Sequence, residues 1–139
     1  MFRGEDIKQL IPQRYPMMMV DEFEEQEEQH ATTALTVRVD NIFVLPSGEF
    51  LESGLLEHIA QSCSALAGFQ ARQRGNTKPP VGMIVEIKNF QCNRRPLAGE
   101  KIETDISFTF SFGNMTLAHG TTRIGEENIA EVEMKIFIQ

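Results

Sequence analysis

Apolar and polar residues alternate strictly over Lys101–Phe112, where the even positions carry Ile, Thr or Phe and the odd positions carry charged or hydroxyl residues. A period of two predicts a strand with one buried and one solvated face. Gly113-Asn114 then indicates a tight turn, and 125–128 a second one. The second half of the chain therefore predicts an antiparallel meander, with strands expected at 81–92, 101–112, 115–124 and 129–138.

A different pattern occupies Gly54–Arg74, where Leu55, Ile59, Cys63 and Leu66 recur at helical spacing. Ser53 is expected to cap its start, and Gly75 to follow its end. Small side chains keep this helix thin enough for a curved sheet to close around it, so it is expected to be buried. They are Ala60, Ser62, Ser64, Ala65, Ala67 and Gly68.

The first 52 residues predict shorter elements. A short helix is expected at 7–11, strands at 17–23 and 31–39 with the acidic run between them as a turn, and a structured loop at 40–52. No repeat, linker or low-complexity tract divides the chain beyond that acidic run. Residues 1–139 are therefore expected to form a single α+β domain, an antiparallel sheet wrapped around one long helix.

The chain has 139 residues and a net charge of −7, from 13 basic and 20 acidic side chains. Because the acidic run at 21–28 supplies six of these charges, the remainder is almost neutral. No basic field favours nucleic acid, and no apolar stretch approaches the ~20 residues that span a bilayer. The N-terminus MFRGEDIKQL lacks the apolar core of a secretory signal, so a cytoplasmic protein without nucleic-acid or membrane partners is expected.

The cysteines and histidines do not form a recognisable metal or redox motif. Cys63 and Cys92 are far apart, and His30, His58 and His119 lack ligand spacing, so neither a metal nor a cofactor is expected. Cys63 falls among apolar helix positions and is expected to be a buried, inert thiol. His58 is expected to be packed or partly exposed.

The polar residues of the helix are the candidates for chemistry. Glu57 shares a helical face with Gln61 and Ser64, which makes a small polar stripe. Glu57 is either an exposed first-turn acid favoured by the helix dipole, or a carboxyl group in an apolar tunnel, where desolvation raises the pKa and allows general-acid catalysis. Gly54 lets backbone N–H groups at the helix start approach a carbonyl, although glycine is also common there for conformational reasons.

Two small basic groups interrupt the acidic balance. Arg72 and Arg74 stand at the end of the helix, where cations are favoured by the dipole. Lys88, Arg94 and Arg95 lie in and after a strand and are either a rim for docking an anionic carrier or exposed charges without a partner.

Three segments carry a resemblance to a known family. Residues 10–21, LIPQRYPMMMVD, are similar to the opening motif of the FabZ-type β-hydroxyacyl-acyl-carrier-protein dehydratases. Residues 54–61, GLLEHIAQ, resemble the central-helix motif of that family, and 95–100, RPLAGE, resemble its RPVxPGD segment. An even closer likeness is to the dehydratase-like proteins of aryl-polyene clusters. The resemblance covers almost the whole chain and implies the hotdog fold that the periodicity also predicts.

The family removes water from a 3-hydroxyacyl thioester. A histidine takes the α-proton, an acid on the central helix of the other protomer protonates the leaving hydroxyl, and N–H groups at the helix start polarise the carbonyl. The resemblance thus implies that Glu57 is the acid and that Gly54, Leu55 and Gln61 contact substrate. The family's histidine belongs to a GHFPG loop, and the corresponding 43–50 segment here, FVLPSGEF, contains none.

Three functions remain open at this stage. The chain is a dehydratase-like protein without its base, which forms a homodimer, a heterodimer with a dehydratase paralogue, or a higher oligomer. Alternatively it is a thioesterase in which the carboxylate activates water, or a subunit that binds an acyl chain without chemistry. Each implies an acyl thioester of acyl carrier protein or coenzyme A as the ligand, and the first implies fatty-acid or polyene biosynthesis.

Overall fold

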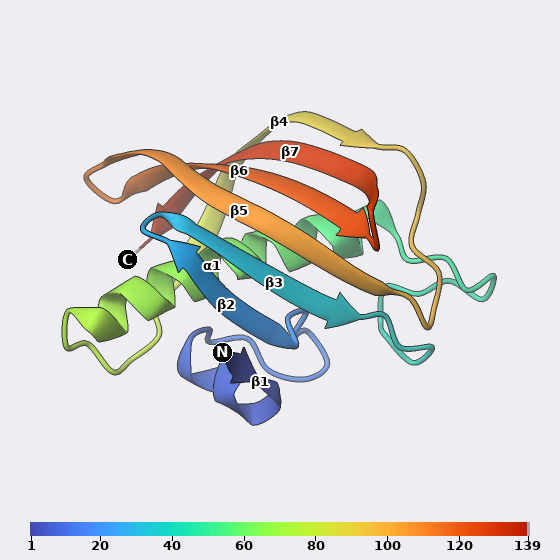
Figure 1. The fold of residues 1–139 in the computed structure, drawn as a ribbon, viewed down its shortest axis with the longest axis horizontal. Helices are drawn as coiled ribbons and strands as arrows, with labels where there is room; N and C mark the ends of the chain where they lie inside the picture. Colours follow the sequence, from blue (N-terminus) through green and yellow to red (C-terminus); the bar gives the residue numbers. More distant parts are fainter. Residues whose placement is uncertain (139) are drawn as a thin grey trace.

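One curved sheet covers a single long helix in the computed structural model, which describes residues 1–138 (Figure 1). All strand pairs are antiparallel, and the strand order is β1-β2-β3-β5-β6-β7-β4. The predicted α+β hotdog architecture is confirmed. The elements are β1 (Phe2–Arg3), a 3-10 helix η1 (Gly4–Gln9), β2 (Glu22–Glu27), β3 (His30–Thr36), α1 (Glu52–Gln73), β4 (Gly82–Cys92), β5 (Lys101–Phe112), β6 (Met115–Ile124) and β7 (Glu127–Ile138).

The helix is buried as its small residues predict, because neighbouring elements approach its backbone closely. A Cβ built at Gly68 would collide with the backbone carbonyl of Leu10. One built at Gly120 of β6 would lie 2.9 Å from Ile59 Cγ2. Within residues 1–138, no helix is long and apolar enough to cross a membrane.

The N-terminal end of α1 differs from the prediction, and the C-terminal end agrees with it. The N-cap is Leu51, whose side chain makes no capping hydrogen bond, and Ser53 already lies inside the helix, so the predicted Ser53 cap is wrong. Apolar packing replaces capping here, since Phe43 and Phe50 pack against Gly54 at the helix start. At the other end Gly75 has φ 92°, the left-handed conformation that glycine adopts at a helix end.

The second half of the chain follows the predicted meander, but the first half contains a correction. The strand expected at 17–23 begins only at Glu22, and the acidic run expected to be a turn forms β2 itself. The turn is confined to 28–29, where Gln29 has φ 66°. Only Phe23 of β2 is fully buried, so the glutamates of this peripheral strand stay in solvent at no desolvation cost.

The two edges of the sheet are unlike. At one edge, β1 is two residues long and covers only the start of the acidic β2. The other edge is β4, whose apolar residues Met83, Val85 and Ile87 are 61%, 54% and 41% exposed. A long apolar edge strand offers unpaired backbone groups together with apolar surface, so β4 is the edge open to pairing with another chain.

Candidate functional site

Glu57 lies in the second turn of α1 and is half-buried. Its Oε2 accepts a hydrogen bond of 2.8 Å from Gln61 Nε2, one helical turn further on. The polar stripe predicted from spacing therefore exists as a direct contact, and the orientation of the Glu57 carboxyl group is fixed by its neighbour.

Gln61 is itself held by the segment that precedes β2. Its Nε2 also donates to the Met17 carbonyl at 2.7 Å, while its Oε1 accepts from the Met19 N–H at 2.6 Å. Because both amide hydrogens and the oxygen are engaged, Gln61 joins the N-terminal segment to the helix and orients Glu57 at the same time.

A cavity of about 270 Å³ opens beside Glu57. Its walls come from α1, from β4 and β7, and from Gln13 in the N-terminal segment. The Oε1 atom of Gln13 is buried and has no hydrogen-bond partner among the residues described. An unpaired buried acceptor costs about 1–3 kcal/mol, so its presence beside a carboxyl group marks a place where a ligand can supply a donor.

His58 points away from this cavity into the core. Its Nδ1–H donates to the Met19 carbonyl at 2.7 Å, and its Nε2 accepts from the Thr104 hydroxyl at 2.9 Å. The Thr122 hydroxyl in turn donates to Thr104 Oγ1 at 2.6 Å. Burial lowers the pKa of His58 to about 4, against the opposing effect of the Met19 carbonyl, so the ring is neutral near pH 7. His58 is the packed histidine that the sequence predicts.

No histidine lines the cavity beside Glu57 within residues 1–138. His119 lies on β6 with its Nε2 3.8 Å from Glu131, and His30 begins β3. The 43–50 segment forms the expected loop and packs Phe43 and Phe50 edge to face, with ring centroids 6.3 Å apart. Glu57 is thus an acid without a base from its own chain in the part of the structure described.

The helix start offers less to a ligand than its sequence suggests. The N–H groups of Gly54 and Leu55 both donate to the Leu51 carbonyl, at 3.0 and 3.1 Å. Both residues are buried, and Phe43 and Phe50 lie against Gly54. Gly54 is therefore required for close packing of aromatic rings, and the structure does not show its N–H directed toward a ligand.

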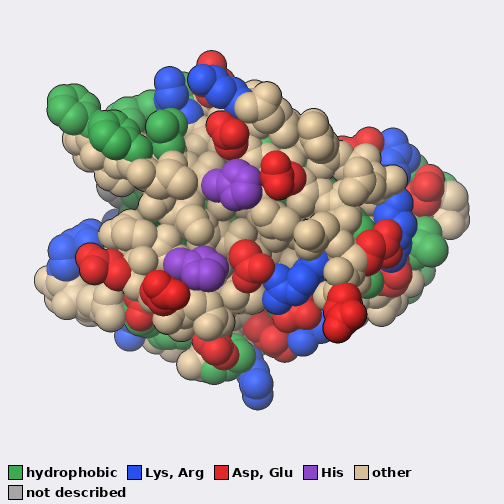
Figure 2. Space-filling model, turned by 45° about the horizontal axis from the view of Figure 1, so that its top comes forward, with side chains coloured by type: hydrophobic (Ala, Val, Ile, Leu, Met, Phe, Trp, Pro, Cys, Tyr) green, Lys and Arg blue, Asp and Glu red, His purple; other side chains and the backbone are tan. Residues whose placement is uncertain are grey.

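The basic residues expected to form a docking rim do not gather. Lys88 pairs with Glu86 at 3.4 Å, Arg94 pairs with Glu100 and Glu127, and Arg95 pairs with Glu49 and Glu52. An acidic carrier would meet compensated charges at these three residues. Figure 2 shows cationic and anionic side chains interspersed on one face of the molecule.

The cysteines have no arrangement for catalysis. Cys63 is fully buried in α1, and burial raises the pKa of its thiol to about 12, which keeps it protonated and inert as predicted. Cys92 donates a weak hydrogen bond to the Arg94 carbonyl. Within the described chain, His, Cys, Asp and Glu form no group of three suited to a metal ion.

The fold and the carboxyl-bearing central helix define a dehydratase-like hotdog protein, and the comparisons agree. The family model of the ApeP-like proteins, described as ApeP dehydratase, matches residues 5–139. The chain belongs to this ApeP-like dehydratase family.

Two curated relatives are named 3-hydroxyacyl-[acyl-carrier-protein] dehydratase FabZ. That of Pseudothermotoga lettingae is 31% identical over 106 residues, covering 73% of this chain and 71% of the relative. That of Clostridioides difficile is 26% identical and covers 96% of this chain and 95% of the relative.

Among solved structures, the dehydratase heterocomplex ApeI:P from Xenorhabdus doucetiae contains a chain that superposes with a TM-score of 0.88 at 14% identity, covering 96% of this chain and 90% of that one. A hypothetical thioesterase with coenzyme A from Streptococcus pneumoniae superposes with a TM-score of 0.65 at 11% identity, covering 85% and 84%. At these identities the likeness concerns the fold.

One residue of the site was not assigned a role from the sequence. Gln13 stands in the opening motif LIPQRYPMMMVD, where its residue type and spacing indicated no role. Its place opposite Glu57 follows from the chain crossing α1 at Leu10, and no local periodicity could have revealed it.

Proposed function

We propose that this chain is the acid-bearing subunit of a dehydratase that acts on 3-hydroxyacyl thioesters, and that a partner chain supplies the base. The observation that carries the proposal is Glu57, an oriented carboxyl group in a cavity that contains no histidine and opens beside β4. The structural neighbour belongs to a dehydratase heterocomplex, which supports a partner of the dehydratase class.

The open edge is the place for that partner. A dehydratase paralogue whose loop carries histidine would pair its edge with β4 and complete the cavity from the other side. A homodimer would bring together two acids and, from the described residues, no histidine beside either. A heterodimer therefore gives one complete site, with the acid from this chain and the base from the paralogue.

The reaction divides between the two chains. The partner's imidazole removes a proton from C2 of the thioester, and the electron pair forms the C2–C3 double bond as the C3–O bond breaks. Glu57 in its protonated form gives its proton to the leaving hydroxyl, which departs as water. The protonated imidazole and the Glu57 carboxylate then return to their starting forms by proton transfer.

Within the chain, Gln61 and Gln13 assist as positioning groups. Gln61 holds Glu57 Oε2, which leaves the other carboxyl oxygen for the substrate. Gln13 Oε1, the unpaired acceptor, takes a hydrogen bond from the substrate's 3-hydroxyl group. The acyl chains would be those of fatty-acid or aryl-polyene biosynthesis, carried on acyl carrier protein or coenzyme A.

A dehydration assay tests this assignment. The purified chain is incubated with a 3-hydroxyacyl thioester, alone and with a paralogue carrying an intact GHFPG loop, and enoyl formation is followed by ultraviolet absorbance. We expect product only with both chains. Activity of this chain alone would contradict the requirement for an external base.

Substitution of the acid sharpens the test. Glu57→Gln in the mixture should lower the rate about 10²- to 10⁴-fold, the usual value of general-acid assistance. Glu52→Gln is the matched control, because Glu52 lies on the same helix but pairs with Arg95 and does not line the cavity. Full activity of Glu57→Gln would remove Glu57 from the mechanism.

The same assay distinguishes the other two functions. A carboxylate that activates water would release free thiol from the thioester and form no enoyl product, which identifies a thioesterase. Saturable acyl-thioester binding without either product would identify a binding subunit. Both outcomes would contradict the dehydratase proposal.

A further inference from the structure

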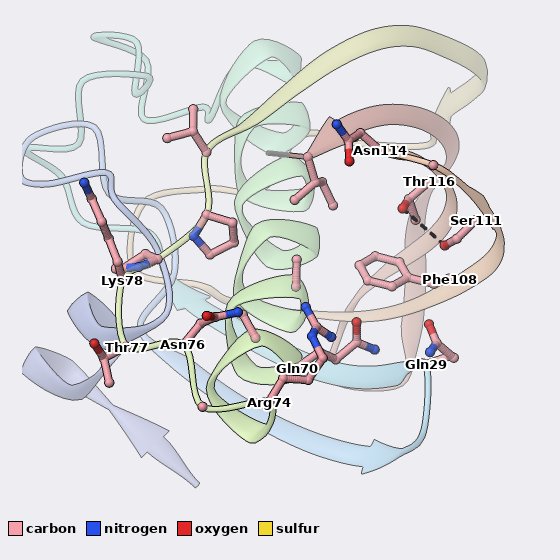
Figure 3. Close-up of a pocket in the computed structure, with 18 residues that line it drawn as sticks. Gln29, Gln70, Arg74, Asn76, Thr77, Lys78, Phe108, Ser111, Asn114 and Thr116 are labelled. Atoms are coloured by element: carbon pink, nitrogen blue, oxygen red, sulfur yellow. Dashed lines mark hydrogen bonds between the residues drawn. The ribbon is translucent and has the colours of Figure 1, made fainter.

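A second and larger cavity, of about 880 Å³, lies at the other end of α1 (Figure 3). It is bounded by the last turns of α1, the 75–81 loop and the tip of the β5–β6 hairpin. Amide and hydroxyl side chains line it together with two cations, Arg74 and Lys78, and it has no aspartate or glutamate in its wall. This wall is suited to an anion.

Most of the basic side chains that form no ion pair in residues 1–138 lie near this cavity. Of its 13 basic side chains, eight form ion pairs with carboxylates. The five without such a pair in residues 1–138 are Arg3, Arg14, Arg72, Arg74 and Lys78. Three of these five fall within seven residues at the end of α1. In a chain of net charge −7, this is where a negatively charged ligand meets the least competition from the protein's own carboxylates.

The two cavities are neighbours along one groove. The smaller one ends at Ser64 of α1, Gly82 of β4 and Ile136 of β7. The larger one begins at Ala67, three residues further along α1, at Val81, immediately before β4, and at Ile138, two residues further along β7. A ligand that reacts at Glu57 can therefore extend along the groove toward Arg74.

The length of the groove sets the size of that ligand. From Glu57 to Arg74 the helix rises about 25 Å. Side chains on a helix lean back toward its start, and the longer Arg74 side chain leans further than that of Glu57, which leaves roughly 20–25 Å between the carboxyl and guanidinium groups. In Figure 3, Arg74 and Gln70 extend from the helix toward the side on which Phe108 lies.

Acyl carrier protein and coenzyme A present their thioesters on the same arm, a phosphopantetheine. From the 3-hydroxyl of an acyl group to the phosphorus of this arm, the chain of bonds is about as long as six extended residues, roughly 20 Å. The arm's amide groups match the amide and hydroxyl side chains of the wall, and its phosphate matches a planar guanidinium donor.

We propose that the cavity at the end of α1 binds the phosphate of the pantetheine arm, with Arg74 as the principal contact and Gln70 and Asn76 as neighbouring donors. The inference rests on the proposed function, since it places the arm of the same thioester whose hydroxyl meets Glu57. It also moves carrier recognition away from Lys88, Arg94 and Arg95, whose charges are already compensated.

The experiment compares two inert ligands that differ only in the phosphate. Octyl thioethers of 4′-phosphopantetheine and of pantetheine are titrated into the full chain by calorimetry. We expect the phosphorylated ligand to bind at least tenfold more tightly. Arg74→Gln should abolish this difference without changing the affinity for the pantetheine ligand, and added salt should weaken only the phosphorylated ligand.

Arg72→Gln is the matched control. It removes the same charge two residues before Arg74, but the Arg72 side chain does not line the cavity. A third ligand, pantetheine carrying an ω-carboxyoctyl thioether, distinguishes the orientation. If Arg74→Gln weakens this ligand and not the phosphorylated one, the cavity binds the far end of the acyl chain and the inference is wrong.

The remaining outcomes separate this inference from the proposed function. Equal affinity for the two octyl ligands, with dehydration observed in the presence of the paralogue, would overturn the phosphate site alone. Dehydration that fails while Arg74 discriminates the phosphate would overturn the proposed reaction alone. Binding of neither ligand to the chain would overturn the phosphate site, and enoyl formation in the mixture would still decide the proposed reaction.

Discussion

The two sides of the sheet are completed to different degrees. On the β2–β3 side, polar contacts through Gln61 and His58 hold the N-terminal segment against α1, and the two-residue edge strand β1 covers the start of the acidic β2. On the β4 side, one cavity lies between the helix and an 11-residue edge strand with exposed apolar residues, and a second cavity lies at the end of the helix. The proposed chemistry lies entirely on this second side. The β2–β3 side is closed by contacts within the chain, whereas the β4 side leaves an edge strand open to another molecule.

The largest expected effect is a loss of stability on the β2–β3 side. Gly68→Val would push a side chain against the Leu10 carbonyl, which is backbone and cannot turn aside. We expect a loss of about 3–4 kcal/mol in the free energy of unfolding, measured by urea denaturation. Gly75→Ala is the control, since its Cβ meets open space and costs only about 1 kcal/mol through its left-handed φ. Equal losses would show that the contact at Gly68 is not decisive.

The next effect is a pH dependence of the free energy of unfolding, which arises from His58 on the same β2–β3 side. The pKa of His58 is lowered from 6.5 to about 4 in the folded chain, so between these values the unfolded chain binds a proton that the folded chain does not. Stability should therefore fall as pH falls through this window, by about 3 kcal/mol from this group. His58→Gln, which cannot titrate, should show a smaller fall in urea midpoints between pH 7 and pH 4. Parallel curves would contradict the assignment.

A third prediction concerns association through the β4 edge. Val85→Lys with Ile87→Lys places charge on the exposed edge strand without touching either cavity wall. Association with a second chain, measured by analytical ultracentrifugation, should weaken at least a hundredfold, equivalent to about 2.7 kcal/mol. The stability of the separated chain should be almost unchanged, because both side chains are already exposed.

The smallest effect sharpens the comparison. Glu24→Lys with Gln26→Lys adds the same number of lysines to the β2 edge, where both residues are exposed. Association should be unaffected and stability should change by no more than about 0.5 kcal/mol. Loss of association in this variant would show that the partner binds the β2 edge and not the β4 edge.

The sequence predicted the elements with a regular hydrophobic period and missed features that depend on contacts between distant residues. Alternation over Lys101–Phe112 and helical spacing over Gly54–Arg74 located β5 and α1 because period follows directly from backbone geometry. The acidic β2 was missed, since its strand is defined by pairing with β3 rather than by a buried face. Ser53 was assigned as a cap on residue type, while aromatic packing on Gly54 determines the observed start.

The candidate site shows the same division. Glu57 and Gln61 were found because they lie one turn apart on a helix, and their hydrogen bond confirms that they share a face. Gln13 lies 44 residues before Glu57, and the cavity at the end of α1 joins four separate segments between Gln29 and Ile138, so no pattern within one segment could place them.

The contacts that hold the N-terminal segment have a kinetic consequence. Met19 bonds to a ring 39 residues later in the chain, and Met17 to an amide 44 residues later. A sheet that begins with β1 and ends with β4, the strand that follows the helix, adds further distant pairings. Loops of this length must close before the helix gains its cover, so folding belongs to the slow, non-local class and is expected on the scale of milliseconds to seconds. During that interval the apolar edge of β4 is available to any neighbouring chain, so early encounter with the proposed partner would be an advantage in folding.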